Sequence, residues 1–127
     1  KIFNIKKKSD LPKIVMPVHL SGNPCDMQEL KKLSKKYKFK IIEDASHASG
    51  SKIGKDLVGS CKLSDIAVFS FHPVKTITSG EGGAILTNSK KIYEKLKILR
   101  NQGITKKTNP DEVISKKLSR DPCGIGT

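Results

Sequence analysis

Short apolar segments alternate with amphipathic helical patterns along this chain, and that alternation constrains the fold most strongly. The apolar segments are rich in β-branched or aromatic residues and run into turn residues, which predicts strands. These segments are "KIVMPVHLSG" (13–22), Phe39–Ile42, "DIAVFSF" (65–71) and "GGAILTN" (82–88). Strands that alternate with helices favour an α/β fold with a mainly parallel sheet.

The first helix is predicted within "CDMQELKKLSKKYKF" (25–39). Asp26, followed three residues later by Glu29, has the spacing of a capping box at a helix start. One helical face carries the apolar residues Met27, Leu30, Leu33 and Tyr37. That face is expected to pack on the sheet.

The second helix is predicted within "SKKIYEKLKILRNQG" (89–103). Ser89 is the expected N-cap, and Gly103 lies just past the expected end. Ile92, Leu96 and Leu99 share one helical face and are expected to point inward.

Length and charge bound the class of protein. A chain of 127 residues fits one small domain or a piece of a larger one. The net charge of +13 could attract nucleic acid, acidic lipid or a phosphorylated substrate. The lysines are dispersed over expected solvated surfaces without interleaved aromatic residues, so we expect no nucleic-acid partner. A small basic nucleic-acid-binding module remains an alternative that the charge permits.

The cysteines and the hydropathy pattern indicate the cellular compartment in which the protein is expected. Cys25, Cys61 and Cys123 are odd in number, far apart and without a CxxC pair, which indicates neither a disulfide framework nor a zinc site. No apolar run reaches the ~18 residues of a membrane helix, and the first ten residues lack a signal-peptide pattern. We therefore expect a cytoplasmic protein without a membrane partner.

Chemistry-bearing side chains gather where the predicted strands end. Asp44 follows one strand and His47 lies in the loop after it, while Ser70 and His72 close the next strand and Lys75 lies just beyond. In open α/β sheets, reactive groups collect at the carboxyl ends of the strands. A strand-end lysine near a carboxylate suggests Schiff-base chemistry with a carbonyl compound.

Lys75 differs from the other lysines in its surroundings. It is the only Lys, Arg, Asp or Glu between Asp65 and Glu81, and Val74 and Ile77 flank it. A neutral, apolar setting is what a buried amine needs, so we expect Lys75 to be buried. An ordinary surface lysine is the alternative.

Metal-dependent hydrolysis is a rival interpretation, because His19, His47 and His72 all lie near predicted strand ends and could converge with Asp44. Their spacing fits no usual ligand motif, so we expect no metal site.

Two glycine-containing segments also need an interpretation. "GSKIGK" (50–55) lacks the spacing and the final Ser or Thr of a phosphate-binding loop, which excludes that motif. "SGEGG" (79–83) predicts a tight backbone turn into the last strand, with close approach to a ligand as the alternative.

Several motifs together resemble a known family. "PVHLSG", "IIEDASHASGS", "VGS", "DIAVFSFHPVKTITSGEGGAILTN" and "LRNQGI", in this order and spacing, are similar to the DegT/DnrJ/EryC1/StrS family of pyridoxal-phosphate (PLP)-dependent nucleotide-sugar aminotransferases. The resemblance implies part of a fold type I (aspartate aminotransferase) large domain, a three-layer α/β/α sandwich with a mostly parallel sheet. Residues 1–104 would belong to this PLP-binding domain, and residues 105–127 would form a divergent or truncated tail.

The resemblance also implies roles for the candidate residues. Lys75 would form the internal aldimine with PLP and then move a proton between the cofactor and the sugar. Asp44 would pair with the pyridine nitrogen, His47 would lie beside the ring near its phenolic oxygen, and Ser70 would bind the cofactor phosphate. His72 belongs to the motif and is the candidate substrate contact.

The "PVH" and "ASHASGS" variants are most similar to the pseudaminic-acid branch, which aminates C4 of a UDP-linked 4-keto-6-deoxy-N-acetylhexosamine with glutamate as the expected donor. The 4-amino-arabinose branch is an alternative. A sugar dehydratase or a non-catalytic relative is another alternative, but such relatives replace the lysine that Lys75 matches.

The resemblance finally implies partners and missing parts. The parent enzyme would be a homodimer with shared active sites. The family's upstream phosphate loop, its ring-stacking aromatic residue and its small C-terminal domain have no counterpart in this sequence, so we expect the fragment alone to be inactive.

Overall fold

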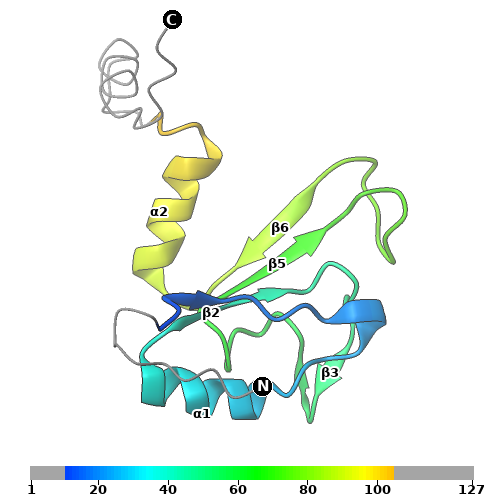
Figure 1. Cartoon of the computed structure of the whole chain (residues 1–127). Coiled ribbons are helices and arrows are strands. Elements are labelled where there is room, and N and C mark those ends of the chain that lie inside the picture. The colour runs from blue at the N-terminus through cyan, green and yellow to red at the C-terminus, as the bar shows by residue number, and fades with distance from the viewer. Residues whose placement is uncertain (1–10, 105–127) are drawn as a thin grey trace, which may run out of the picture. The chain divides into compact units, whose positions relative to one another are not determined.

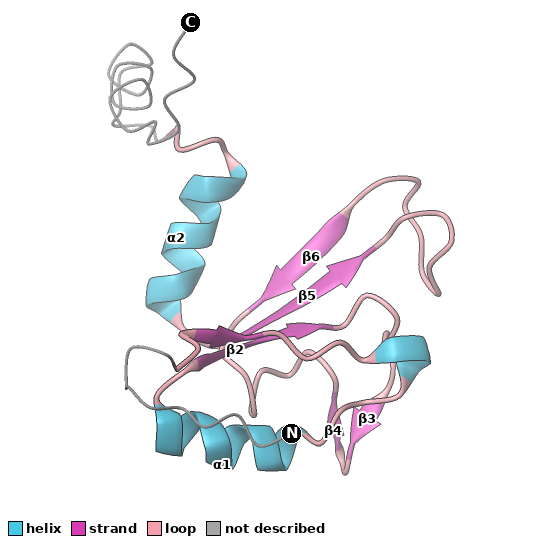
Figure 2. Ribbon diagram, viewed as in Figure 1, coloured by secondary structure: helices cyan, strands magenta, loops and turns pink. Residues whose placement is uncertain are grey.

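The computed structural model describes residues 11–104, and the chain divides into two compact units after Ser89. The first unit holds a four-stranded sheet in the order β1-β2-β5-β6 and a small β3-β4 hairpin (Figures 1 and 2). The strands are β1 (Ile14–Val15), β2 (Lys40–Asp44), β3 (Lys52–Ile53), β4 (Asp56–Leu57), β5 (Ile66–Ser70) and β6 (Gly83–Leu86). The β1-β2 and β2-β5 pairs are parallel and the β5-β6 pair is antiparallel, which confirms the predicted mostly parallel sheet.

The first strand is shorter than predicted. Pro17 has no N–H to donate, so the regular ladder ends after Val15 and resumes only as a bridge between Val18 and Asp44. A short 3-10 helix, η2 (Leu20–Gly22), follows. The segment 13–22 is therefore a short strand, a bridge and a turn.

Helix α1 (Met27–Tyr37) begins and ends as its sequence indicates. Asp26 Oδ1 accepts the Glu29 N–H at 3.0 Å, which confirms the predicted cap. The Glu29 carboxylate instead pairs with Lys32 at 3.2 Å, so only half of the capping box forms. Lys38 adopts the left-handed conformation at φ 64° and stops the helix.

The apolar face of α1 packs on the sheet (Figure 1). Met27 and Ile41 are fully buried and Phe39 lies with them. Six partly buried side chains pack against this cluster, namely Val15, Cys25, Leu30, Leu33, Ile53 and Leu63. Tyr37, which we expected to share this face, is 38% exposed. Burial of these aliphatic side chains is the main force that holds α1 against β1 and β2.

Strand register shows which residues share the opposite face of the sheet. Ile14 pairs with Lys40, and Val68 pairs with Ile85, so alternate residues of the four strands share that face. Its exposed apolar side chains include Ile14, Met16, Val18 and Ile85, at 48–56% exposure. Within the described part of the first unit, α1 and the sheet thus form two layers of the expected sandwich.

The second unit contains α2 (Lys90–Arg100). Of the residues predicted on one face of α2, Ile92 and Leu96 are half-buried and Leu99 is 71% exposed within the described residues. The predicted stop at Gly103 is confirmed, because Gly103 has φ 82° and donates to Ile98 O at 2.8 Å.

Two remaining expectations concern the tail and membrane-spanning helices. Residues 105–127, the expected tail, lie outside the described residues. None of the described helices is long and apolar enough to cross a membrane.

Candidate active site

Asp44 and Ser70 lie on the same face of the sheet, where β2 and β5 end. Asp44 pairs with Val68 in the parallel β2-β5 ladder, and Ser70 is two residues further along β5. Because side chains alternate between faces, Val68, Ser70 and Asp44 share one face. The structure therefore brings together two of the predicted site residues through strand register alone.

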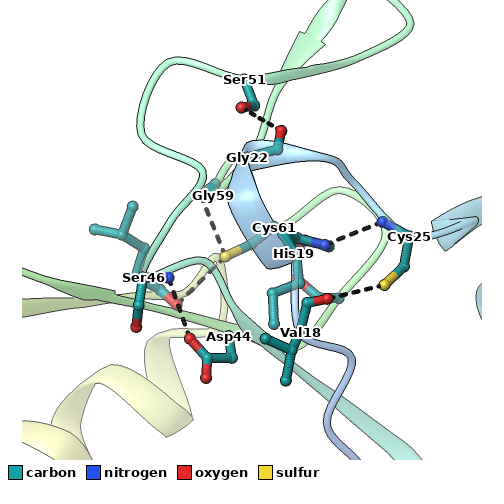
Figure 3. A network of polar contacts seen from close by, with 12 residues as sticks. Val18, His19, Gly22, Cys25, Asp44, Ser46, Ser51, Gly59 and Cys61 are labelled. Atoms are coloured by element: carbon teal, nitrogen blue, oxygen red, sulfur yellow. Dashed lines mark hydrogen bonds and ion pairs between the residues drawn. The ribbon is translucent and has the colours of Figure 1, made fainter. Parts of the chain in front are cut away.

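The Asp44 carboxylate is held in its ionised form. The Ser46 side chain hydrogen-bonds it, and the Ser46 backbone N–H donates to Oδ1 at 3.1 Å (Figure 3). These bonds, together with the electrostatic effect of nearby His47 and Lys75, outweigh partial burial and lower the pKa of Asp44. The site thus contains a fixed negative charge.

Lys75 and His47 meet directly. Lys75 Nζ lies 2.9 Å from His47 Nε2, a hydrogen-bond distance between an amine and an imidazole. Three other described lysines pair with carboxylates instead: Lys32 binds Glu29, Lys40 binds Asp65 and Lys62 binds Asp56. Lys75, His47 and Asp44 therefore form one cluster at the carboxyl end of the sheet.

The loop that carries His47 is tied to η2. Ser51 Oγ donates to Gly22 O at 2.8 Å (Figure 3). Gly22 has φ 82°, and a Cβ there would lie 3.2 Å from His47 O. The small residues of the two loops thus allow the close packing that places His47.

The loop that carries Lys75 is closed at its base. The Phe71 N–H donates to Gly82 O at 2.9 Å, and the Ser79 N–H donates to Phe71 O at 3.1 Å. A Cβ at Gly83 would lie 2.6 Å from Phe69 O, so only glycine fits there without a shift of the backbone. The predicted tight turn at "SGEGG" is confirmed.

The predicted apolar enclosure of Lys75 is wrong for the described residues. Val74 is 79% exposed and Ile77 is 58% exposed, and Lys75 itself is only half-buried. Both apolar neighbours lie in the loop beyond the closed base, where no described core residue covers them. The sequence pattern showed an uncharged segment, but such a segment is not by itself a buried one.

His72 lies on the same loop but faces elsewhere. Its Nε2 is 4.0 Å from Glu81 Oε1, and its Nδ1 accepts the Val74 N–H at 3.5 Å. Its carbonyl accepts the Lys75 N–H at 2.9 Å. A contact between His72 and substrate stays a prediction.

The three histidines considered for a metal site have separate partners. His19 bonds Glu43, His47 meets Lys75, and His72 faces Glu81. Among residues 11–104, no group of three or more His, Cys, Asp or Glu side chains could hold a metal ion. The histidines therefore do not converge on Asp44 as that hypothesis required.

Sequence reasoning missed a buried network beside the site. Glu43 is 2% exposed and bonds both His19 and the Ser64 hydroxyl. The signal was the pair Glu43–Asp44 on one strand, because alternation sends neighbouring side chains to opposite faces.

This assembly of a strand-end lysine, a carboxylate and a serine agrees with the family match. The sequence matches the DegT/DnrJ/EryC1/StrS aminotransferase family over residues 4–125. The chain belongs to this family. Its aminotransferases are PLP-dependent enzymes, so the predicted family, fold class and cofactor are confirmed.

DegT-family relatives show what the chain is similar to. It is 46% identical over 127 residues to the UDP-4-amino-4,6-dideoxy-N-acetyl-beta-L-altrosamine transaminase of Campylobacter jejuni, covering 96% of this chain and 33% of the relative. It is 43% identical to the dTDP-4-amino-4,6-dideoxy-D-glucose transaminase of Shigella dysenteriae, covering 88% of this chain and 30% of the relative. The chain thus spans about a third of the length of these relatives.

A solved aminotransferase structure has a fold similar to that of this chain. The Helicobacter pylori aminotransferase PseC, involved in pseudaminic acid biosynthesis, matches with a TM-score of 0.68 and 38% identity. The match covers 73% of this chain and 24% of that chain.

The described residues fit the DegT-family cofactor. PLP needs an amine to bind its aldehyde, an anion for its ring nitrogen and donors for its phosphate. Lys75 offers an amine beside His47, and Asp44 is held as a carboxylate by Ser46. Ser70 adds a hydroxyl on the same face of the sheet. The donor set therefore agrees with the chemistry of the cofactor.

Proposed function

We propose that the whole protein is a PLP-dependent aminotransferase that places an amino group on C4 of a UDP-linked 4-keto-6-deoxy-N-acetylhexosamine, with glutamate as donor. The observation that carries this proposal is the contact between Lys75 Nζ and His47 Nε2 at 2.9 Å, beside the ionised Asp44. A reactive amine and a fixed carboxylate at one end of a sheet are the two groups that this chemistry most needs.

The proposal gives each residue a role. Lys75 binds the cofactor covalently through Nζ and carries the proton that moves on and off the sugar's C4. Asp44 holds the proton of the ring nitrogen, which requires a carboxylate rather than an amide. His47 orients the amine and borders the ring, and Ser70 donates to the phosphate. When bound, PLP supplies the electron sink that lets nitrogen pass from one substrate to another.

The relatives support the substrate class. The names of the Campylobacter and Shigella transaminases both describe a 4-amino-4,6-dideoxy sugar linked to a nucleoside diphosphate. They differ in the nucleotide, which is UDP in one and dTDP in the other. The UDP sugar is proposed because the Campylobacter relative is more similar to this chain over a longer alignment.

The exposure of the site supports a shared active site. Val74 and Ile77, on the Lys75 loop, are largely exposed within the described residues. Apolar side chains beside a reactive amine are stabilised when other protein surface covers them. We propose that the whole protein is a homodimer whose partner subunit helps to close this site.

The decisive experiment is borohydride reduction of the whole protein in the presence of PLP, followed by peptide mapping. The label is expected on Lys75, and it should be lost in Lys75→Ala but kept in Lys62→Ala, which removes a lysine paired with Asp56. A label elsewhere, or none, contradicts the proposed cofactor role. Turnover of UDP- and dTDP-linked 4-keto sugars with ¹⁵N-glutamate then tests the nucleotide and the donor.

A further inference from the structure

A buried hydrogen-bond network lies directly behind Asp44, on the other face of β2. The Glu43 side chain is almost fully buried, and its Oε2 lies 3.0 Å from His19 Nε2. Its Oε1 accepts a hydrogen bond from the Ser64 hydroxyl. A buried carboxylate is tolerated only when donors surround it. His19 and Ser64 supply one donor to each Glu43 oxygen.

The orientation of the His19 ring is set from both sides. Its Nδ1 accepts the Cys25 N–H at 3.2 Å (Figure 3). The ring proton therefore lies on Nε2 and points to Glu43. Cys25 Sγ donates to Val18 O at 3.2 Å, which ties the same turn to the residue before His19. The fully buried ring therefore has one tautomer that satisfies both of its nitrogens.

The backbone of His19 also holds Asp44. The His19 N–H donates to Asp44 O at 3.0 Å, and the Asp44 N–H donates to Pro17 O at 2.9 Å. On the other edge, the Ala45 N–H donates to Val68 O at 2.8 Å. His19 thus contacts Asp44 through its main chain and the neighbouring Glu43 through its ring.

We propose that His19 and Glu43 are positioning residues for Asp44. Successive side chains of a strand point to opposite faces, so anchoring Glu43 in the core prevents rotation of β2 about its axis. That restraint keeps the Asp44 carboxylate directed toward the cluster with Lys75. The inference rests on the proposed function, because the target of Asp44 is the ring nitrogen of the cofactor.

The test compares four variants of the whole protein. His19→Ala removes both ring contacts, whereas His19→Gln keeps a donor and an acceptor on one side chain. Glu43→Gln keeps the shape and removes the charge. Ile41→Val is the matched control, because Ile41 is fully buried on the same strand and the same face but lies outside the network.

Two measurements report on Asp44. Hydrogen exchange of the Asp44 amide in the cofactor-free protein reports on the restraint of the backbone. The pH dependence of the visible absorption of bound PLP reports on the interaction with the ring. In His19→Ala, the amide is expected to exchange faster and the absorption midpoint to move by about half a pH unit or more. His19→Gln should recover most of both effects, and Glu43→Gln should show intermediate ones.

The outcomes separate this proposal from the proposed function. If His19→Ala changes both readouts no more than Ile41→Val does, His19 only fills the core and the positioning role is overturned. If wild-type protein shows no PLP absorption that depends on Lys75, the proposed function fails. The exchange of the Asp44 amide still decides whether His19 holds Asp44.

Discussion

Lys75 Nζ and His47 Nε2 lie 2.9 Å apart although the two residues are separated by 28 positions in the sequence. The contact exists because β2 and β5 are neighbours in a parallel ladder, so the loops that follow them leave the sheet at the same end. The cluster therefore depends on strand pairing as well as on its own side chains.

His47→Ala is expected to weaken PLP binding by about 10-fold, because the Lys75 amine loses its hydrogen-bond partner. His47→Gln should stay close to wild type, because an amide oxygen can still accept from the amine. Titration followed by visible absorption measures both affinities. Equal weakening by the two substitutions would show that the contact itself is unimportant.

Asp44→Asn is expected to lower kcat/KM by about 10²- to 10³-fold, because an amide cannot stabilise a charged ring nitrogen. The Asn oxygen can still accept the Ser46 N–H, so the melting temperature should change little. Steady-state kinetics measures kcat/KM, and a thermal melt measures the melting temperature. Activity near that of wild type would remove Asp44 from the mechanism.

Gly83→Ala is expected to lower the free energy of unfolding by about 2 kcal/mol, because the new Cβ would lie 2.6 Å from Phe69 O. Gly54→Ala is the control, since no atom lies within 4 Å of its Cβ position and only its φ of 61° opposes alanine. The control should cost about 1 kcal/mol. Urea unfolding of both variants distinguishes a steric clash from backbone strain.

Acid is expected to destabilise the fold partly through Asp65. Burial acts to raise the pKa of Asp65, but hydrogen bonds from the Lys40 ammonium and the Ile41 N–H outweigh it and lower the pKa. A lowered folded pKa adds stability above the ordinary value of 3.8, and this stability is lost as pH falls through the folded pKa.

Asp65→Asn should therefore be less stable at neutral pH but less sensitive to acid. Lys40→Met should flatten the acid dependence in part, because the Ile41 N–H still binds the carboxylate. Urea unfolding at a series of pH values from 7 to about 3 measures the slopes. A wild-type slope in Asp65→Asn would contradict this assignment.

The sequence was sufficient where local patterns decide the structure. The apolar spacing of Met27, Leu30 and Leu33 predicted a helix face that does pack on the sheet. Asp26 predicted a cap that forms, and the glycines of "SGEGG" predicted a turn that forms. The grouping of Asp44, His47 and Lys75 also followed, because parallel strands place their loops at one edge of the sheet.

The rest depends on contacts that no local pattern encodes. Tyr37 has the spacing of an inward residue of α1, yet it is 38% exposed, because periodicity does not show how far the surface opposite a helix extends. For the same reason, Val74 and Ile77 predicted an apolar enclosure of Lys75 that the described residues do not form. The bond between His19 and Glu43 joins residues from the turn after β1 and from β2, so only the three-dimensional arrangement reveals it.

The alternation of Glu43 and Asp44 on β2 has a consequence for variation in chain length. Deletion of Ile42 would shift the strand frame by one position and exchange the two acids, so that Asp44 would turn into the buried network and Glu43 would turn toward the face that carries the candidate site. Loss of a single residue here would therefore disturb the buried network and the candidate site together, whereas the exposed turn at Gly54 and Lys55 could absorb the same loss as a local change.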